Sequence, residues 1–247
     1  MIFRQVLHHD PIAISYVFGC GGRSVGAVCD PIDDPELYIR LSEENGLRLQ
    51  YIIDTHLHAD HISGGRRLAE RTGAKYVLHA SADTQMEVYR VNDGDILDLG
   101  NVFMRVLHTP GHTPEHISLL ITDRTRGPEP WFLLSGHTVM VGDVGRTELV
   151  NHPEVGARVL FNSIQNLKQL PDYLEIFPGA YAGSVCGRAL SGKPVSTVGF
   201  ERRSNRAFQI DDADAFVRYM LESIPPPPPD AAAIRAANQG LIATPGI

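Results

Sequence analysis

The order of predicted strands and helices favours an α/β fold, an αβ/βα sandwich with two mixed β-sheets face to face and helices outside. Two observations carry this prediction. Short segments rich in β-branched and aromatic residues alternate with helical patterns along most of the chain. Gly, Pro and Asp residues separate these segments and mark the turns between them.

The first half of the chain predicts mostly strands, with two helices between them. Helical spacing of apolar residues indicates a helix from Pro35 to Asn45, with Gly46 as its C-cap. A second helix is expected from about Ile62 to Thr72, closed by Gly73. The predicted strands cover 2–7, 12–18, 24–30, 48–53 and 76–78.

The second half continues with a hairpin of strands at 95–98 and 102–108, then strands at 117–122, 131–135 and 174–177. Helices are expected from His152 to about Leu170 and near 212–222. We therefore expect a domain at 1–224 and a Pro-rich spacer with a C-terminal tail at 225–247. The five prolines favour a stiff extended segment, with a ligand for a proline-binding domain as the alternative. A short helix at 230–238, capped by Gly240, follows.

Composition is typical of a water-soluble enzyme. The chain has 247 residues, and Lys+Arg 22 against Asp+Glu 29 gives 22 − 29 = −7. This acidic balance, without a basic cluster, argues against nucleic acid as a partner. No apolar run reaches the ~18 residues of a membrane helix, and the N-terminus lacks the pattern of a signal peptide. Three cysteines make no disulfide framework, so we predict a cytoplasmic protein.

The run from Thr55 to His61 is the densest group of potential metal ligands in the chain. It contains His56, His58, Asp60 and His61, directly after the apolar segment 49–53. Imidazole and carboxylate are natural ligands of divalent metals. His56 and His58 can project to the same side of an extended turn, while Asp60 and His61 fall where a second ion or a bound water would lie. A polar loop leading into a helix is the alternative, but the spacing favours a metal.

Other histidines follow predicted strands. His112 lies in a Pro-Gly turn and is the best candidate for a third ligand, whereas His108 is expected to be structural. His116 could support a ligand or belong to the core. His137 comes at the end of an apolar strand, where it can reach a site built at loop ends. The small-residue turn 177–187 follows a predicted strand and is expected to bring its backbone and the thiol of Cys186 close to a neighbouring group.

These motifs, in this order, resemble the metallo-β-lactamase superfamily over about residues 10–210. The resemblance rests on Thr-His-x-His-x-Asp-His, Pro-Gly-His-Thr and the segment 135–147. Segments 144–149 and 183–205 are similar to the persulfide dioxygenase (sulfur dioxygenase) branch, particularly to its rhodanese-fused type. The chain stops at Ile247, where that rhodanese domain would begin, so the resemblance implies a free-standing form with any rhodanese-type sulfurtransferase as a separate partner.

Two positions depart from the family pattern. The bridging Asp expected after Gly136 is His137, and the late histidine expected after Gly179 is Ala180. A pair of metals needs a shared carboxylate oxygen, and one imidazole nitrogen cannot be shared in this way. Asp143 could replace the lost carboxylate if the turn before it folds back.

We therefore predict one metal ion per chain, held by His56, His112 and His137, with His58 as a potential fourth ligand. Asp60 and His61 become catalytic groups that orient ligands and bound water. By resemblance, Arg146, Cys186 and Tyr181 are candidates for substrate binding, although Arg146 could instead fix its loop and Cys186 could be an inert core thiol.

The leading functional hypothesis is a mononuclear Fe(II) dioxygenase that uses O₂ to oxidise a low-molecular-weight thiol persulfide, such as glutathione persulfide, to sulfite. The same three imidazoles also make a catalytic Zn²⁺ site, so a thioester or ester hydrolase of the glyoxalase II type is the alternative. A third hypothesis is a degenerate homologue that binds metal without catalysis. A homodimer is the expected assembly, and no membrane partner is expected.

Overall fold

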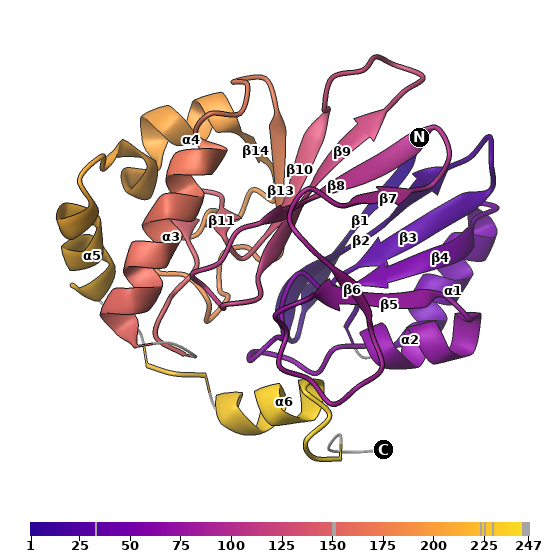
Figure 1. Ribbon diagram of the computed structural model, residues 1–247, viewed down its shortest axis with the longest axis horizontal. Coiled ribbons are helices and arrows are strands. Elements are labelled where there is room, and N and C mark those ends of the chain that lie inside the picture. The colour runs from indigo at the N-terminus through magenta and orange to yellow at the C-terminus, as the bar shows by residue number, and fades with distance from the viewer. Residues whose placement is uncertain (33, 150–151, 223, 225, 229, 244–247) are drawn as a thin grey trace.

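Two β-sheets form the centre of the computed structural model, which describes residues 1–247 apart from 33, 150–151, 223, 225, 229 and 244–247 (Figure 1). Each sheet is mixed, with both parallel and antiparallel neighbours. The first has the order β1 (Ile2–His9), β2 (Ile12–Cys20), β3 (Val25–Cys29), β4 (Arg48–Ile53), β5 (Lys75–His79), β6 (Tyr89–Val91). The second has the order β14 (Ser196–Thr197), β13 (Glu175–Pro178), β10 (Phe132–Gly136), β9 (Ile117–Asp123), β8 (Val102–His108), β7 (Ile96–Asp98).

The main core lies between the two sheets. Tyr16 and Phe18 of β2 and Ile53 of β4 pack there with Met104 of β8 and Leu134 of β10. β2 and β10 are buried along nearly their whole length. Strands covered on both faces become continuous apolar runs rather than alternating patterns. This explains why their sequences read as unbroken hydrophobic segments.

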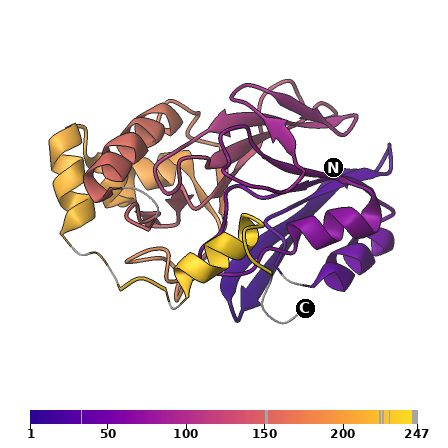
Figure 2. The ribbon, with the colours of Figure 1, turned by 60° about the horizontal axis from the view of Figure 1, so that its bottom comes forward.

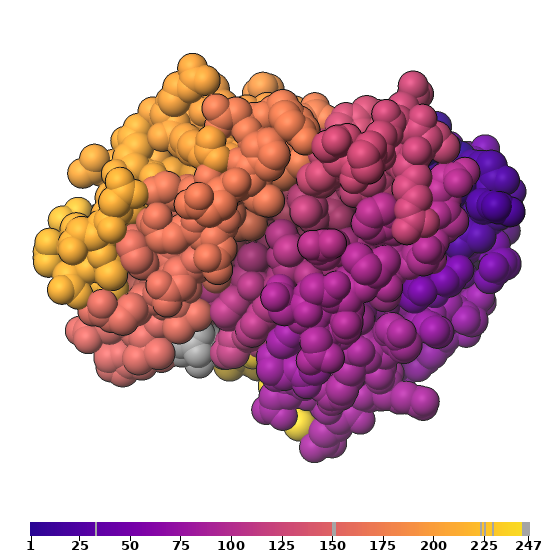
Figure 3. Space-filling view, turned by 45° about the horizontal axis from the view of Figure 1, so that its top comes forward, coloured from indigo at the N-terminus to yellow at the C-terminus, as the bar shows by residue number. Residues whose placement is uncertain are grey.

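Helices cover the outer face of each sheet (Figure 1). α1 (Pro35–Glu44) and α2 (Gly65–Thr72) pack against the first sheet, and α3 (Pro153–Leu167) and α5 (Ala213–Leu221) pack against the second. Capping residues set the ends of these helices. The Asp34 side chain accepts the amide of Glu36 at the start of α1, and Gly73 ends α2 in a left-handed conformation. In Figure 3 the N-terminal and C-terminal parts of the chain gather on opposite sides of the molecule.

The predicted αβ/βα sandwich is confirmed, with differences in detail. α2 begins three residues later than expected, so the His-rich segment stays an irregular loop up to Gly64. Sequence patterns missed β6, β14, α4 (Val198–Ser204) with the 3₁₀ helix Arg206–Gln209, and the small sheet of β11 (Val139–Met140) and β12 (Asp143–Val144). Such short elements leave no periodicity to detect.

The C-terminal segment folds back onto the molecule. Parts of the polyproline run, residues 225 and 229, lie outside the described residues. The expected short helix is present as α6 (Ala231–Asn238), which lies apart from α5 and crosses in front of the junction between the two halves (Figure 2). Among the described residues, none of the helices has the length and apolarity needed to cross a bilayer.

Candidate metal centre

The site is built where strand ends of the two sheets meet. The amide of Ile117, at the start of β9, donates a hydrogen bond of 2.8 Å to the carbonyl of Thr55, just after β4. The loop 56–63 leaves the first sheet here, and the turns after β8 and β10 leave the second. His-bearing segments that are far apart in the sequence are thereby brought to one place.

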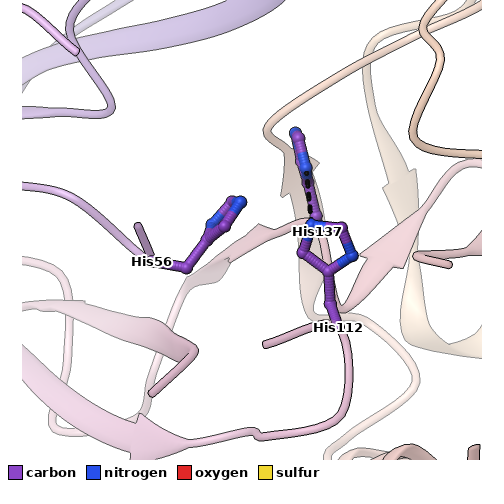
Figure 4. A group of neighbouring side chains, drawn as sticks. All are labelled: His56, His112 and His137. Carbon is purple, nitrogen blue, oxygen red and sulfur yellow. Dashed lines mark hydrogen bonds between the residues drawn. The ribbon is translucent and has the colours of Figure 1, made fainter. Parts of the chain in front are cut away.

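Three histidines converge at this point. Nitrogen atoms of His56, His112 and His137 lie within 4.8 Å of one another, and all three side chains are buried. Figure 4 shows the rings of His112 and His137 close together in an edge-to-face arrangement, with His112 Nε2 and His137 Nδ1 3.3 Å apart, and the His56 ring directed toward them. The predicted trio is therefore brought together by the structure.

The tautomer of His56 is fixed by a relay to Asp30. The Thr55 hydroxyl donates to Asp30 Oδ2 (3.0 Å) and lies 3.0 Å from His56 Nδ1. Since the hydroxyl proton is already committed, His56 Nδ1 carries the hydrogen and donates it to the Thr55 oxygen. The lone pair of His56 is then left on Nε2, a buried atom without a hydrogen-bond partner. Metal-binding histidines are usually oriented in this way.

His112 is oriented by the main chain. Its Nδ1 lies 2.7 Å from the carbonyl oxygen of Arg146, which can only accept, so Nδ1 is protonated and Nε2 presents the lone pair. Close approach requires Gly145, because a Cβ there would lie 3.0 Å from His112 Nδ1 and 2.3 Å from the carbonyl oxygen of His137. The turn 145–146 thus holds the imidazole of His112 toward the centre.

His137 is positioned by His116. The amide of His137 donates to His116 Nε2 (3.0 Å), while His116 Nδ1 faces the hydroxyls of Thr109 and Thr138. Both nitrogens of His116 are engaged, so it supports His137 rather than joining the three. Gly136 has φ +51, and a Cβ there would lie 2.6 Å from His116 Nε2, so only glycine fits.

The three imidazoles are neutral at ordinary pH. Burial, together with the neighbouring imidazoles, lowers the pKa of His56 well below its usual value, and burial lowers the pKa of His112 to about 3. Burial likewise lowers the pKa of His137, whose Nε2 also lacks a hydrogen-bond partner. Buried, unpaired nitrogens are costly unless an electron acceptor satisfies them. A divalent metal ion fits this donor set, because neutral imidazole is among its preferred ligands.

A second group borders the first. Ligand atoms of His58, Asp60 and His61 lie within 4.8 Å of one another, and Asp60 Oδ1 is 3.1 Å from His61 Nδ1. Burial would raise the pKa of Asp60, but His61 and His58 lower it well below its usual value. For His58, burial alone would lower the pKa, but the carboxylates of Asp30 and Asp60 raise it well above its usual value. The predicted fourth ligand is thus bonded through Nε2 to Asp30 (3.3 Å), and its Nδ1 lies 3.7 Å from Asp60 Oδ1, so His58 must give up a proton before it can bind a metal.

Cys186 lies beside both groups. Its sulfur and ligand atoms of Asp60 and His137 fall within 4.8 Å of one another, and the residue is buried. Burial and the carboxylate of Asp60 raise the pKa of the thiol well above its usual value. The predicted proximity of this thiol to the histidine cluster is therefore present in the structure.

The other two candidate substrate residues hold the turn that carries Cys186. The Arg146 guanidinium donates to the carbonyls of Val185 (3.0 Å) and Pro226 (2.9 Å) and pairs with Glu148. The hydroxyl of Tyr181 donates to the carbonyl of His8, at the end of β1 (2.7 Å). Neither side chain is placed among the three histidines.

Asp143 does not take the place of the missing carboxylate. Its Oδ1 pairs with the guanidinium of Arg188 (2.9 Å), and its Oδ2 accepts the amide of Arg188 (2.8 Å). Among the described residues, Asp143 belongs to none of the groups of converging potential metal ligands. The carboxylates that do lie beside the histidines are Asp60, Asp30 and Asp54.

Sequence reasoning missed several groups that shape the site. Asp30 anchors both His56 and His58, and its only signal was a carboxylate directly after a buried strand. Burial would raise the pKa of Asp30, but hydrogen bonds from His58 and the Thr55 amide lower it. Glu115 accepts the amide of Leu57 (3.0 Å), which joins the His56 loop to the His112 turn. No local pattern distinguished Glu115 from an exposed acidic residue.

The chain belongs to the metallo-β-lactamase superfamily, whose sequence signature matches residues 21–179, and members of this superfamily are metal-dependent enzymes. Its fold agrees with a crystal structure of a metallo-β-lactamase from Staphylococcus aureus subsp. aureus COL. The two are 36% identical with a TM-score of 0.92 over 96% of this chain and 72% of that chain.

The chain is also similar to persulfide dioxygenases and to hydrolases. Crystalline ETHE1 from Myxococcus xanthus is 28% identical, with a TM-score of 0.85 over 98% of this chain and 99% of that chain. The mitochondrial persulfide dioxygenase ETHE1 of Bos taurus is 26% identical over 89% of this chain and 80% of its own length. A hydroxyacylglutathione hydrolase of Methylobacterium nodulans is 32% identical over 70% of this chain and 60% of its own length. A β-lactamase hydrolase-like protein of Xylella fastidiosa is 29% identical, and the chain spans only 42% of it.

Proposed function

We propose that the protein is a mononuclear Fe(II) persulfide dioxygenase. One ion per chain would be held by His56, His112 and His137, with His58 as a potential fourth ligand. The observation that carries this proposal is the convergence of three neutral, buried imidazoles, two of which present nitrogens without hydrogen-bond partners. The similarity to persulfide dioxygenases along almost the whole chain supports a persulfide substrate.

The proposed reaction consumes one O₂ and one water per persulfide. The S–S bond breaks, the outer sulfur is oxidised to sulfite, and the inner sulfur leaves as the thiol. An Fe(II) ion held by the three histidines would supply the chemistry that activates O₂ beside the persulfide sulfur. The residues of the chain would bind and orient the participants and accept the protons that the reaction releases.

Asp60, His61 and Cys186 would act on the substrate side. Asp60 and His61 offer a carboxylate and an imidazole that could accept the persulfide proton. Cys186 would contact the sulfur chain of the substrate, since its thiol adjoins Asp60 and His137. Arg146 and Tyr181 would set the position of this surface by holding the turn that carries Cys186.

A zinc-dependent hydrolase of the glyoxalase II type is the second candidate. The observation that favours it is the absence of a carboxylate from the trio, because three histidines with an open position are typical of catalytic zinc. The similarity to a hydroxyacylglutathione hydrolase is consistent with it. A degenerate homologue that binds metal without turnover is the third.

Metal analysis and oxygen uptake distinguish these candidates. We expect about one iron per chain and O₂ consumption with glutathione persulfide in the Fe(II)-loaded protein. Thioester hydrolysis by the zinc form without O₂ uptake would replace the proposal with the hydrolase. Metal binding with neither activity would indicate the degenerate homologue, and two tightly bound ions would refute the mononuclear centre.

The cellular setting is part of the same proposal. We propose a cytoplasmic location, supported by three buried cysteines that form no disulfide in the structure. A homodimer and a separate rhodanese-type sulfurtransferase that delivers persulfide remain predictions. Size-exclusion chromatography and a coupled sulfur-transfer assay would test them.

A further inference from the structure

The C-terminal helix α6 contacts the backbone of the loop that carries four potential metal ligands. The side-chain amide of Asn238, a buried group, donates to the carbonyls of His58 and His61, both at 2.9 Å. Its oxygen accepts the amide of Ser63 (3.0 Å). One side chain thus satisfies three backbone groups of the loop 56–63, which lies outside helix and sheet over most of its length.

Arg235, one turn earlier on α6, holds the start of the same loop. Its guanidinium donates to the carbonyl of Leu57 (2.7 Å) and to the two carboxylate oxygens of Glu115 (3.2 and 3.3 Å). Glu115 also accepts the amide of Leu57, and Glu115 is buried. The ion pair therefore connects α6, the His56 loop and the turn that contains His112.

These contacts join segments that are far apart in the chain. Asn238 and the two carbonyls it binds are separated by 180 and 177 residues. α6 follows the proline-rich stretch of sequence after α5, and Figures 1 and 2 both show it apart from α5. The side chain of Gln239, the next residue, makes its contact away from the loop 56–63, since it donates to the carbonyl of Asp83 (3.0 Å).

We propose that α6 is a clamp that preorganises the metal-binding loop, with Arg235 and Asn238 as its positioning residues. Four backbone groups, the carbonyls of Leu57, His58 and His61 and the amide of Ser63, are fixed by these two side chains. The side chains of His56, His58, Asp60 and His61 depend on that backbone for their direction. Metal affinity is therefore set partly by a helix that supplies none of the ligands. The clamp rests on the metal site of the proposed function and does not depend on persulfide chemistry.

Asn238→Asp tests the clamp with almost no change of shape. The carboxylate keeps an acceptor for Ser63 but places an oxygen against the carbonyls of His58 and His61. Gln239→Ala is the matched control, because it removes a side-chain bond from the same helix end without touching the loop. Co²⁺ affinity is measured by chelator competition, together with the visible spectrum of the bound ion and the urea midpoint of the metal-free protein.

We expect Asn238→Asp to weaken Co²⁺ binding by about 10-fold or more, the usual effect of losing groups that orient metal ligands, and to alter the Co²⁺ spectrum. The Co²⁺ affinity of Gln239→Ala should stay within about twofold of that of the wild type. Arg235→Ala should weaken binding in the same direction, and Arg235→Lys should restore part of it by keeping the charge beside Glu115.

Unchanged Co²⁺ affinity and spectrum in folded Asn238→Asp and Arg235→Ala would overturn the clamp. So would failure of both variants to fold, because α6 would then support the whole domain rather than the loop. Wild-type protein that binds metal but consumes no O₂ with persulfide would refute the proposed function and leave the clamp intact.

Discussion

Asp30→Asn is the most direct test of how the site is held together. One carboxylate oxygen accepts the amide of Thr55 (2.7 Å) and faces His58 Nε2 (3.3 Å), while the other accepts the Thr55 hydroxyl (3.0 Å). The asparagine side chain has the same shape but keeps only one oxygen, and its NH₂ group then faces a group that donated a hydrogen bond to Asp30. At least one of these bonds is lost, and the others lose their charge assistance.

The magnitude follows from these contacts. A hydrogen bond to a charged group contributes about 1.5–3 kcal/mol, so losing one and weakening two should lower the unfolding free energy by about 3 kcal/mol. A domain stable by about 5–15 kcal/mol survives this change. The metal-bound state loses more, since His56 and His58 are then free to rotate away, and metal affinity should fall by about 10- to 100-fold.

The assay combines urea unfolding of the metal-free protein with competition for Co²⁺. Asp34→Asn is the control, because Asp34 is an exposed cap of α1 at the other end of the loop that carries Asp30, and its replacement by Asn retains capping. Equal Co²⁺ affinity in Asp30→Asn and the wild type would show that the relay through Thr55 does not orient the metal ligands.

Three further variants test separate parts of the site. His137→Asp should retain one metal and preserve or improve persulfide turnover in an oxygen electrode, and metal binding identical to the wild type would show that His137 is not a ligand. Cys186→Ser should leave metal content unchanged but lower oxygen uptake at limiting persulfide, and an unchanged KM would remove Cys186 from the substrate surface. His112→Gln should flatten the acid dependence of metal-free stability. His112, with a folded pKa of about 3, stays neutral in the fold but is protonated in the unfolded chain below about pH 6.5. Neutral His112 therefore makes its full contribution to the unfolding free energy above pH 6.5. That contribution is lost by about 1.4 kcal/mol per pH unit as the pH falls toward 3, which urea unfolding at a series of pH values measures.

The sequence predicted the histidines that converge in the structure better than the residues that support them. His56 and His58 stand at a spacing that indicates metal binding, and His137 follows an apolar strand, so local pattern was enough to find them. Asp30 could be found only by knowing that β3 and β4 are parallel neighbours, with Cys29 beside Ile53, which brings the two following residues together. Asn238 required the path of the C-terminal segment after the prolines. Long-range contacts of this kind leave no local periodicity, which is why the tail read as a spacer.

The exchange of carboxylate for imidazole at position 137 changes the charge of the centre more than its shape. Three neutral imidazoles leave a divalent ion with its full double charge in a buried site, and such a charge is costly unless anions lie close to it. Asp60 and Asp30 provide negative charge nearby, and an anionic persulfide would add more. We therefore expect the wild type to bind the persulfide more tightly than His137→Asp, in which the new carboxylate already neutralises part of the charge. Affinity and turnover should then move in opposite directions in this variant, with KM rising while kcat is maintained or increased. A variant in which KM falls would show that the charge of the ligand set does not govern substrate binding.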